Sequence, residues 1–382
     1  MENYEYQKHH KYFAQVAGSL EKHAAQELGE LGAEVLGEVP RGLRFQCDPE
    51  TLYRVLYTSR LAQRVLAPLI SFNCHSEKYL YKLARERIDW TGLFALDQKF
   101  AIESNVSASH IKHSLYAGQI LKDAICDSFR DKYQARPDFS SSAPDILFNL
   151  HIHENFANIY LDLAGISMHK RGYRKAAGDA PLQETLAAAL IRLSGWNGEK
   201  PLLDPMCGSG TILCEALMHL CKIPAAYLRG VGALRLLPDF DPQLWKKVKD
   251  KADAAIIKPE PGMIKGSDIY GINLEIAREN LNSLPHGKLV ELRESPFQAL
   301  PGHPNHVIIT NPPYGVRIGE IKTIGLLYNE LGDFLKQKCP HSEAYVLCGN
   351  DALVSELRLR AHWKKSLKNG DITTKFAKIV LR

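Results

Sequence analysis

The residues best suited to chemistry are four that directly follow an apolar run. Residues 306–310, His-Val-Ile-Ile-Thr, predict a buried strand, and Asn311-Pro312-Pro313-Tyr314 comes after them. The Asn311 amide oxygen can accept a hydrogen bond from an amino group. The prolines stiffen the backbone, which leaves the Pro312 carbonyl free to accept another, and Tyr314 offers a ring face. This pattern favours a catalytic clamp for a planar amine, although a proline turn with a packed tyrosine is the alternative.

A glycine-rich turn, about a hundred residues upstream, predicts a second site. Residues 202–211, Leu-Leu-Asp-Pro-Met-Cys-Gly-Ser-Gly-Thr, predict a short strand, a tight turn and the start of a helix. The spacing is not the dinucleotide pattern G-x-G-x-x-G, because position 213 is leucine, and the Gly-Lys-Ser/Thr of a phosphate loop is missing. Asp204 would repel a pyrophosphate, so the turn suits a ligand with a cationic amino-acid end.

Together, segments 204–211 and 311–314 resemble the S-adenosylmethionine-dependent amino-methyltransferases. The resemblance implies S-adenosylmethionine as cofactor, with Asp204 and the turn at Gly208 and Gly210 holding its amino-acid end. Asp268, which ends a second strand, would bind the ribose hydroxyls. The other residues that the resemblance places around the cofactor are Pro205, Thr211, Ile269, Ser295 and Leu182.

Two positions depart from that family's pattern. Ser295 stands where an aspartate usually binds the adenine amine, and either it or Glu294 takes that role. Tyr270 stands in place of a second aspartate, and it either stacks near adenine or only fills space. Leu182 belongs to a helix expected over 180–190, with Pro181 at its first position.

The amino-terminal half resembles a THUMP domain, an RNA-binding module of RNA-modifying enzymes. The segments that carry this resemblance are the alternating run 145–153, its expected partner strand 158–165, and residues 84–90. A basic linker follows, in which Lys170, Arg171, Tyr173 and Arg174 mix cations with an aromatic ring, as phosphate contact and base stacking require. The alternative is that the arginines pair within the protein.

Over residues 10–382 the chain resembles the bacterial 23S rRNA guanine-N2 methyltransferases, which have also been labelled N6-adenine-specific DNA methylases. The resemblance implies methylation of the exocyclic N2 amine of a guanine in RNA, with 23S rRNA as substrate. The clamp alone leaves N6-adenine or N4-cytosine methylation of DNA or RNA open. A non-catalytic RNA-binding assembly factor is the alternative of another class.

The expected architecture is α/β. Residues 1–70 would form a ferredoxin-like α+β subdomain, 71–166 the THUMP domain and 167–180 the basic linker. Residues 181–382 would form a Rossmann-like methyltransferase domain with a mostly parallel sheet, because strand and helix patterns alternate there. Asn369-Gly370 predicts a terminal antiparallel hairpin. Residues 222–264 are too long for an ordinary connection and predict an inserted subelement near the site.

Composition narrows the class of protein only modestly. The 382 residues carry a net charge of +5, and residues 1–180 balance at 22 basic and 22 acidic side chains. The excess lies in residues 351–382, with 8 basic and 3 acidic side chains, which suits either a polyanion or a solvated face. No apolar run approaches the roughly 20 residues that span a membrane. The start of the chain does not resemble a signal peptide, and eight cysteines without a C-x-x-C pair favour reduced thiols, so we expect a cytoplasmic protein. We expect no metal and no obligate protein partner.

Overall fold

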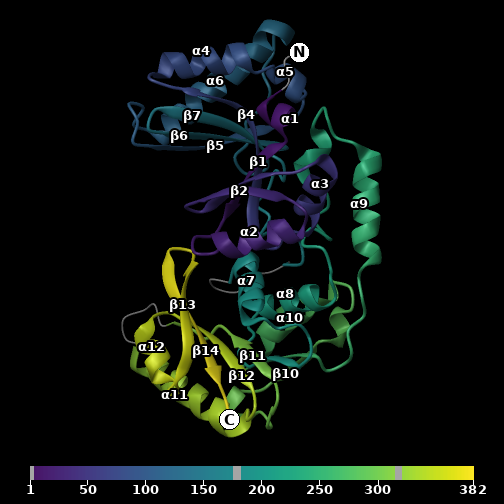
Figure 1. Ribbon diagram of the computed structural model, residues 1–382, viewed down its shortest axis with the longest axis vertical. Coiled ribbons are helices and arrows are strands. Elements are labelled where there is room, and N and C mark those ends of the chain that lie inside the picture. The colour runs from purple at the N-terminus through teal and green to yellow at the C-terminus, as the bar shows by residue number, and fades with distance from the viewer. Residues whose placement is uncertain (1–3, 175–181, 315–320) are drawn as a thin grey trace. The chain divides into compact units, whose positions relative to one another are not determined.

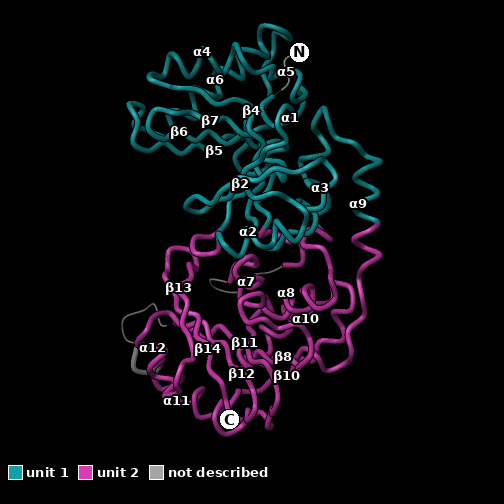
Figure 2. The backbone as a smooth tube through the Cα atoms, in the orientation of Figure 1, with its two compact units in different colours: residues 1–16, 21–168, 229–250 teal, residues 17–20, 169–228, 251–382 magenta. Residues whose placement is uncertain are grey.

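The computed structural model describes residues 4–174, 182–314 and 321–382, and the chain divides into two compact units (Figure 2). Unit 1 consists of residues 1–16, 21–168 and 229–250. Unit 2 consists of residues 17–20, 169–228 and 251–382. Each unit contains one seven-stranded sheet, so the α/β class expected from the sequence is confirmed.

Unit 1 is an α+β unit whose elements follow the sequence patterns closely. They are α1 (Glu5–His9), β1 (Lys11–Val16), α2 (Glu21–Glu30), β2 (Glu34–Val39), β3 (Gly42–Gln46), α3 (Pro49–Thr58), β4 (Ala62–Asn73), α4 (Glu77–Arg87), α5 (Trp90–Leu93), β5 (Phe100–Ser107), α6 (Ser114–Tyr133), β6 (Ile146–His153) and β7 (Phe156–Asp162). Local signals explain several of these bounds. For example, α3 starts where the Asp48 carboxylate accepts a 2.7 Å bond from the Thr51 amide, with proline at the first helical position.

The sheet of unit 1 has the strand order β2-β3-β1-β4-β7-β6-β5. The long strand β4 pairs with β1 on one side and with β7 on the other. The ferredoxin-like and THUMP-like regions expected over 1–70 and 71–166 therefore share one continuous sheet. This sharing is a long-range pairing that strand patterns alone do not contain.

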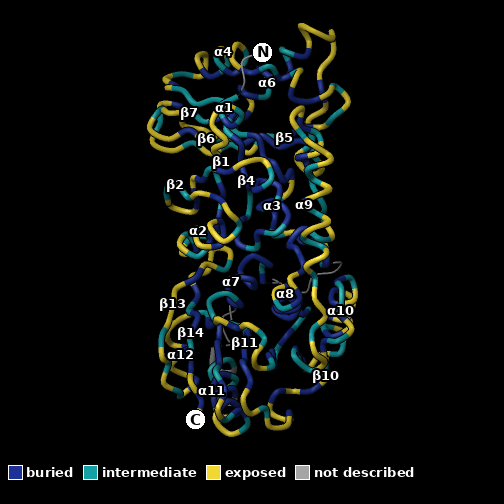
Figure 3. The backbone as a smooth tube through the Cα atoms, turned by 45° about the vertical axis from the view of Figure 1, so that its right-hand side comes forward, coloured by how far each residue is buried: buried dark blue, intermediate teal, exposed yellow. Residues whose placement is uncertain are grey.

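Part of the long connection after α8 packs in unit 1. It contains η1 (Gly232–Leu236) and most of α9 (Pro242–Ala254), an exposed amphipathic helix (Figure 3). The Trp245 ring lies 5.2 Å from the Tyr57 ring, centroid to centroid, and the Asp241 amide donates a 2.9 Å bond to the Tyr53 hydroxyl. Residues 229–250 of the expected insertion therefore pack against α3, where the Trp245 side chain is half-buried.

Unit 2 alternates strands and helices (Figure 1). Its elements are α7 (Glu184–Ser194), β8 (Leu202–Asp204), α8 (Thr211–Leu220), β9 (Ile264–Asp268), α10 (Gly271–Asn282), η2 (Gly287–Leu289), β10 (Glu291–Glu294), η3 (Phe297–Ala299), β11 (Val307–Thr310), α11 (Ile321–Lys338), β12 (Glu343–Cys348), α12 (Asp351–Glu356), β13 (Ala361–Asn369) and β14 (Ile372–Val380). The helix expected over 180–190 begins only at Glu184, after Gln183, so Pro181 is not its first residue. Pro181 itself lies outside the described residues.

The sheet of unit 2 has the strand order β10-β9-β8-β11-β12-β14-β13. Strands β8 to β12 are parallel, and the terminal hairpin pairs antiparallel to β12 through β14, as the sequence predicts. The chain leaves β8 toward β9 and β10 and then returns to β11 on the other side of β8. This reversal makes the carboxyl ends of β8 and β11 the switch point at which doubly wound sheets bind ligands.

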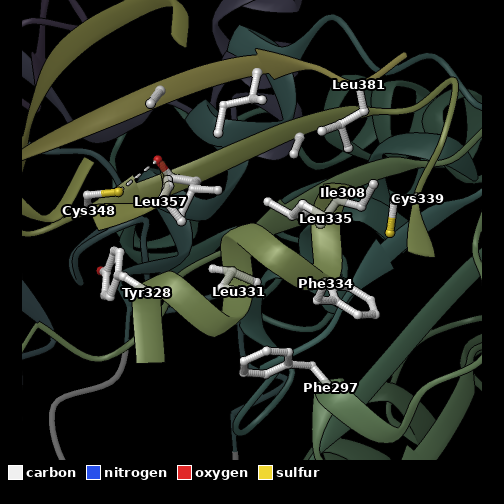
Figure 4. Packing of buried hydrophobic residues seen from close by; sticks show 14 of the residues in the cluster. Phe297, Ile308, Tyr328, Leu331, Phe334, Leu335, Cys339, Cys348, Leu357 and Leu381 are labelled. Carbon is white, nitrogen blue, oxygen red and sulfur yellow. Dashed lines mark hydrogen bonds between the residues drawn. The ribbon is translucent and has the colours of Figure 1, made fainter. Parts of the chain in front are cut away.

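Buried helices hold these strand ends in place. Residues 211–218 of α8 are all buried, as expected for a mostly apolar central helix, and they include the charged Glu215. On one face of the sheet, α11 packs its apolar side chains against the strands (Figure 4), and the cluster includes Ile308, Tyr328, Leu331, Phe334 and Leu335. The eight cysteines are free and buried, so they pack as small apolar side chains.

No helix in the described ranges is long and apolar enough to cross a membrane.

Candidate functional site

The strand order gathers the predicted site residues at one edge of the unit 2 sheet. Asp204 ends β8, Asp268 ends β9, Ser295 follows β10 and Asn311 follows β11. These four strands are neighbours and parallel, so the four residues lie along the same carboxyl edge. Residues separated by more than a hundred positions in the chain are thereby brought into one site.

The glycine turn closes against the neighbouring strand. Gly208 has φ +52° and Gly210 has φ +78°, backbone angles that favour glycine. The Gly208 amide donates a 2.9 Å bond to Oδ2 of Asp268. A Cβ on Gly208 would meet nothing within 4 Å, whereas one on Gly210 would lie 3.0 Å from the Ala277 Cβ. The turn is thus open at Gly208 and tightly packed against α10 at Gly210.

Asp204 is a buried carboxylate held in one orientation. Its Oδ1 accepts a 2.8 Å bond from the Thr310 hydroxyl and a 3.2 Å bond from the Met206 amide. Burial raises the pKa of Asp204 to about 7, nearby Asp268 adds to the rise, and the two hydrogen bonds oppose it. Such a carboxyl is poised to ionise beside a cationic group. Thr310 was missed from the sequence, where its only signal is a hydroxyl at the end of an apolar strand.

Asp268 accepts hydrogen bonds at both oxygens. Besides the Gly208 amide, its donors are the Tyr270 amide and the side-chain amide of Asn273, each 3.0 Å from Oδ1. These bonds hold the carboxylate in place and leave acceptor capacity for ribose hydroxyls. Asn273 is a second residue that sequence reasoning missed, although an amide in the first turn of the next helix is the natural partner for this acid.

The residues expected around the adenine ring line the same edge. Ile269 and Tyr270 are 53% and 61% exposed, which is high for large side chains beside a sheet edge. The Ser295 amide donates a 3.0 Å bond to the Asp268 carbonyl, and its hydroxyl donates to the Pro296 carbonyl at 3.1 Å. The Ser295 oxygen can therefore still accept a bond. The Pro205 carbonyl already accepts a 3.1 Å bond from Ser267.

The clamp residues lie at the end of β11. Pro312 is buried, Pro313 is exposed, and Asn311 and Tyr314 are half-buried. The Tyr314 hydroxyl donates to the amide oxygen of Asn311, which orients that amide and leaves a second lone pair on its oxygen. Burial raises the pKa of Tyr314, and the nearby side chain of Asn369 offsets part of the rise.

Arg174 lies beside the glycine turn and not on an open surface. Its Nη2 donates to the Leu182 carbonyl at 2.8 Å and to the Thr211 hydroxyl at 3.0 Å, and its Nε lies 3.2 Å from the Glu184 carboxylate. Arg174 thus ties the segment before α7 to the first residue of α8. This position fits support of the cofactor turn better than the predicted contact with RNA.

Burial contradicts the predicted RNA contact for Arg171 and Tyr173. Their exposed fractions are 1% and 0%, so neither side chain can reach a phosphate or stack on a base. The Arg171 Nε lies 3.3 Å from Oε1 of the buried Glu215, and the Tyr173 hydroxyl donates to the same oxygen at 3.1 Å. A charge buried in the apolar helix α8 requires partners, and this lone acid was the missed signal. Lys170 remains exposed.

The donor set fits S-adenosylmethionine. Three groups meet at the switch point of the doubly wound sheet. They are a buried carboxylate for a cationic amino-acid end, an open glycine turn, and a second, oriented carboxylate for ribose hydroxyls. This fold and site define the class of Rossmann-like methyltransferases.

Comparison with known proteins agrees with this class. The family described as the RMKL-like methyltransferase domain matches residues 171–378, the THUMP domain matches 74–162, and the RlmL ferredoxin-like domain matches 11–66. A Synechocystis protein provisionally named an RNA methyltransferase is 38% identical over 94% of both chains. A crystal structure of SMU.472, provisionally described as a methyltransferase and complexed with SAH, has a TM-score of 0.86 at 26% identity and covers 97% of this chain and 98% of its own.

A longer relative matches over part of its length. The ribosomal RNA large subunit methyltransferase K/L of Vibrio parahaemolyticus is 35% identical over 94% of this chain, which spans 52% of that relative. The chain belongs to the RMKL-like methyltransferase family and carries a THUMP domain. These comparisons confirm three predictions: the family resemblance, the Rossmann-like fold and S-adenosylmethionine as the cofactor.

Proposed function

We propose that this chain transfers a methyl group from S-adenosylmethionine to the exocyclic N2 amine of a guanine in RNA, and that the RNA is 23S ribosomal RNA. The names of the relatives and the THUMP domain support RNA as the substrate. The name of the Vibrio relative supports the large ribosomal subunit. We also propose a division into segments 1–70, 71–166, 167–180 and 181–382, with residues 229–250 packed in unit 1.

One observation carries the chemical part of the proposal. The clamp of Asn311 and Tyr314 follows β11, and Thr310, the last residue of that strand, is hydrogen-bonded to Asp204 beside the glycine turn. An amine held by the clamp would therefore lie at the same sheet edge as the methyl donor. A purely structural proline turn would not need an oriented, half-buried amide there.

The residues of the clamp suit an aromatic amine. Such an amine is a weak nucleophile because its lone pair is delocalised, and no strong base is needed before it attacks. S-adenosylmethionine supplies an electrophilic methyl group. The Asn311 amide oxygen and the Pro312 carbonyl can accept the two N–H bonds, while Tyr314 stacks on the base, so the lone pair is turned toward the methyl carbon. Positioning of this kind contributes at most about 7–11 kcal/mol.

We propose that the cofactor is held by Asp204, by the turn at Gly208 and Gly210, and by Asp268. The supporting contacts are the bonds from Thr310 to Asp204 and from Asn273 to Asp268. Pro205, Thr211, Ile269, Ser295 and Leu182 complete the proposed lining. Of the residues proposed for RNA, Lys170 is the one that stays exposed.

The test is methyl transfer from labelled S-adenosylmethionine to unmodified 23S rRNA, followed by nucleoside analysis. We expect N2-methylguanosine. Transfer to duplex DNA, or the appearance of N6-methyladenosine or N4-methylcytidine, would replace the proposed acceptor. Cofactor binding without transfer to any nucleic acid would favour the assembly factor.

The variant Asn311→Ala removes the amide acceptor and should abolish transfer, while the affinity for S-adenosylmethionine stays within about tenfold, because the cofactor contacts come from other strands. Undiminished transfer by this variant would show that the clamp is not the active site.

A further inference from the structure

The terminal hairpin extends past the edge at which the site lies (Figure 1). The last paired residue of β12, Cys348, lies opposite Lys375, whereas β13 and β14 stay paired as far as Asn369 and Ile372. Residues 367–374, which we call the hairpin tip, therefore project beyond the carboxyl end of β12 by roughly three residues of each strand, or about 10 Å. That is enough to form a wall beside a nucleotide bound at the edge.

The hairpin tip lies next to the clamp. A Cβ on Gly349, directly after β12, would lie 2.9 Å from the Cβ of Tyr314. Asn369, at the end of β13, lies near enough to the Tyr314 hydroxyl to lower its pKa. The clamp tyrosine thus packs against the residue that follows β12 and lies near the hairpin tip.

The lysines of the hairpin fall into two groups. Lys364 and Lys375 both pair with Asp351, at 2.5 and 3.2 Å, and Lys378 pairs with Glu343 at 2.8 Å. These cations are compensated within unit 2.

Lys365 and Lys368 are exposed, and no carboxylate among the described residues lies within ion-pair distance of either. The Lys365 ammonium lies 5.2 Å above the Trp363 ring, which limits its freedom. Asp371 is the acid of the hairpin tip and is exposed. Successive side chains of a strand point to opposite faces, so Lys365 and Lys368, three residues apart, reach solvent from opposite faces of the outermost strand.

Lysines on an edge strand also prevent pairing with other chains. That role does not require them to be near the clamp. The position of Lys368 in the tip that projects past the site edge is what favours a role toward the substrate.

We propose that the terminal hairpin docks the RNA strand at the site, with Lys368 in the hairpin tip and Lys365 two residues before the tip binding phosphates of that strand. The proposal rests on the proposed function, because it requires an RNA substrate. It supplies in unit 2 a phosphate contact that the buried Arg171 cannot make.

The test compares three full-length proteins, measuring RNA affinity against salt concentration with unmodified 23S rRNA as probe. They are the unchanged chain, Lys365→Gln/Lys368→Gln, and the control Lys288→Gln/Lys336→Gln. The control lysines are exposed in unit 2 near the amino ends of β10 and β12, the opposite edge of the sheet. Each lost phosphate contact lowers the magnitude of the salt slope by about 0.7 for a single strand, so we expect a decrease of about 1.4 in the hairpin variant and none in the control.

Affinity for S-adenosylmethionine should be unchanged in all three proteins. Unfolding midpoints report any loss of folding, and light scattering reports any association of chains through the edge strand. The single variant Lys368→Gln leaves the contact between Lys365 and Trp363 intact and should still lower the magnitude of the salt slope by about 0.7.

An unchanged slope in the hairpin variant, or an equal loss in the control, overturns the inference while leaving the proposed function standing. If the unchanged chain neither binds nor methylates RNA, the proposed function fails, and this inference fails with it.

Discussion

Replacing Gly349 by alanine tests whether the position of Tyr314 controls methyl transfer. Gly349 does not have a positive φ, so alanine can adopt its backbone conformation. The added Cβ would lie 2.9 Å from the Tyr314 Cβ and 3.1 Å from its Cγ. Carbon atoms in ordinary contact are about 3.5–4.0 Å apart, so Tyr314 or the end of β12 must move by about 0.6–1.1 Å.

A displacement of this size should affect the rate much more than cofactor binding. Misplacement of a reacting group by about 1 Å can lower the rate about a hundredfold. The hydrogen bonds that hold Asp204 and Asp268 involve neither Gly349 nor Tyr314, so we expect the affinity for S-adenosylmethionine to be unchanged. Overpacking at this position should lower the free energy of unfolding by about 1–3 kcal/mol.

The assay is single-turnover transfer to RNA, together with calorimetric binding of S-adenosylmethionine. Gly325→Ala, in α11, is the matched control, because its nearest neighbour would be 3.8 Å away and its rate should not change. In a Tyr314→Gly background, Gly349→Ala should have little further effect, since both the Cβ and the ring that it displaces are gone. A transfer rate within twofold of the unchanged chain, or a full effect in the Tyr314→Gly background, would refute the reasoning.

Two further predictions follow from buried groups in unit 2. The pKa of Asp204 rises from its usual 3.8 to about 7 on folding, so the folded protein binds this proton more tightly, and the stability of the ligand-free protein falls as pH rises between these values. A cationic ligand favours the ionised form of Asp204, so the affinity for S-adenosylmethionine should increase from pH 5.5 to 7.5, and binding below pH 7 should release a proton. Calorimetry measures both, and the affinity of the Asp204→Asn variant should not change with pH. Tyr173→Phe removes a hydrogen bond to buried Glu215 and should cost about 1–3 kcal/mol in denaturant unfolding, whereas Tyr116→Phe, at a 50% exposed position, should cost under about 0.5. Loss of RNA affinity at unchanged stability in Tyr173→Phe would contradict its burial.

Local patterns were good predictors of the elements in both units. The glycine turn, the strand before the clamp and the Asn369-Gly370 hairpin all lie where the sequence predicted them, because each depends on neighbouring residues. The start of α7 was misplaced, since a proline can precede a helix as well as begin one. The segment containing Arg171 and Tyr173 was misinterpreted because cations beside an aromatic ring suit RNA and a buried carboxylate equally well.

By itself, the sequence determined which chemical groups the proposed site can offer. An amide, two prolines and a tyrosine after one strand, and an acid before two glycines after another, are recognisable because bond-forming groups and backbone angles belong to the residues themselves. The tertiary structure decided which of these groups meet. Three contacts join residues that are 35 or more positions apart: the hydrogen bond from Thr310 to Asp204, the bonds of Arg171 and Tyr173 to Glu215, and the packing of Tyr314 against Gly349. Such contacts depend on strand order and burial, which no local pattern contains.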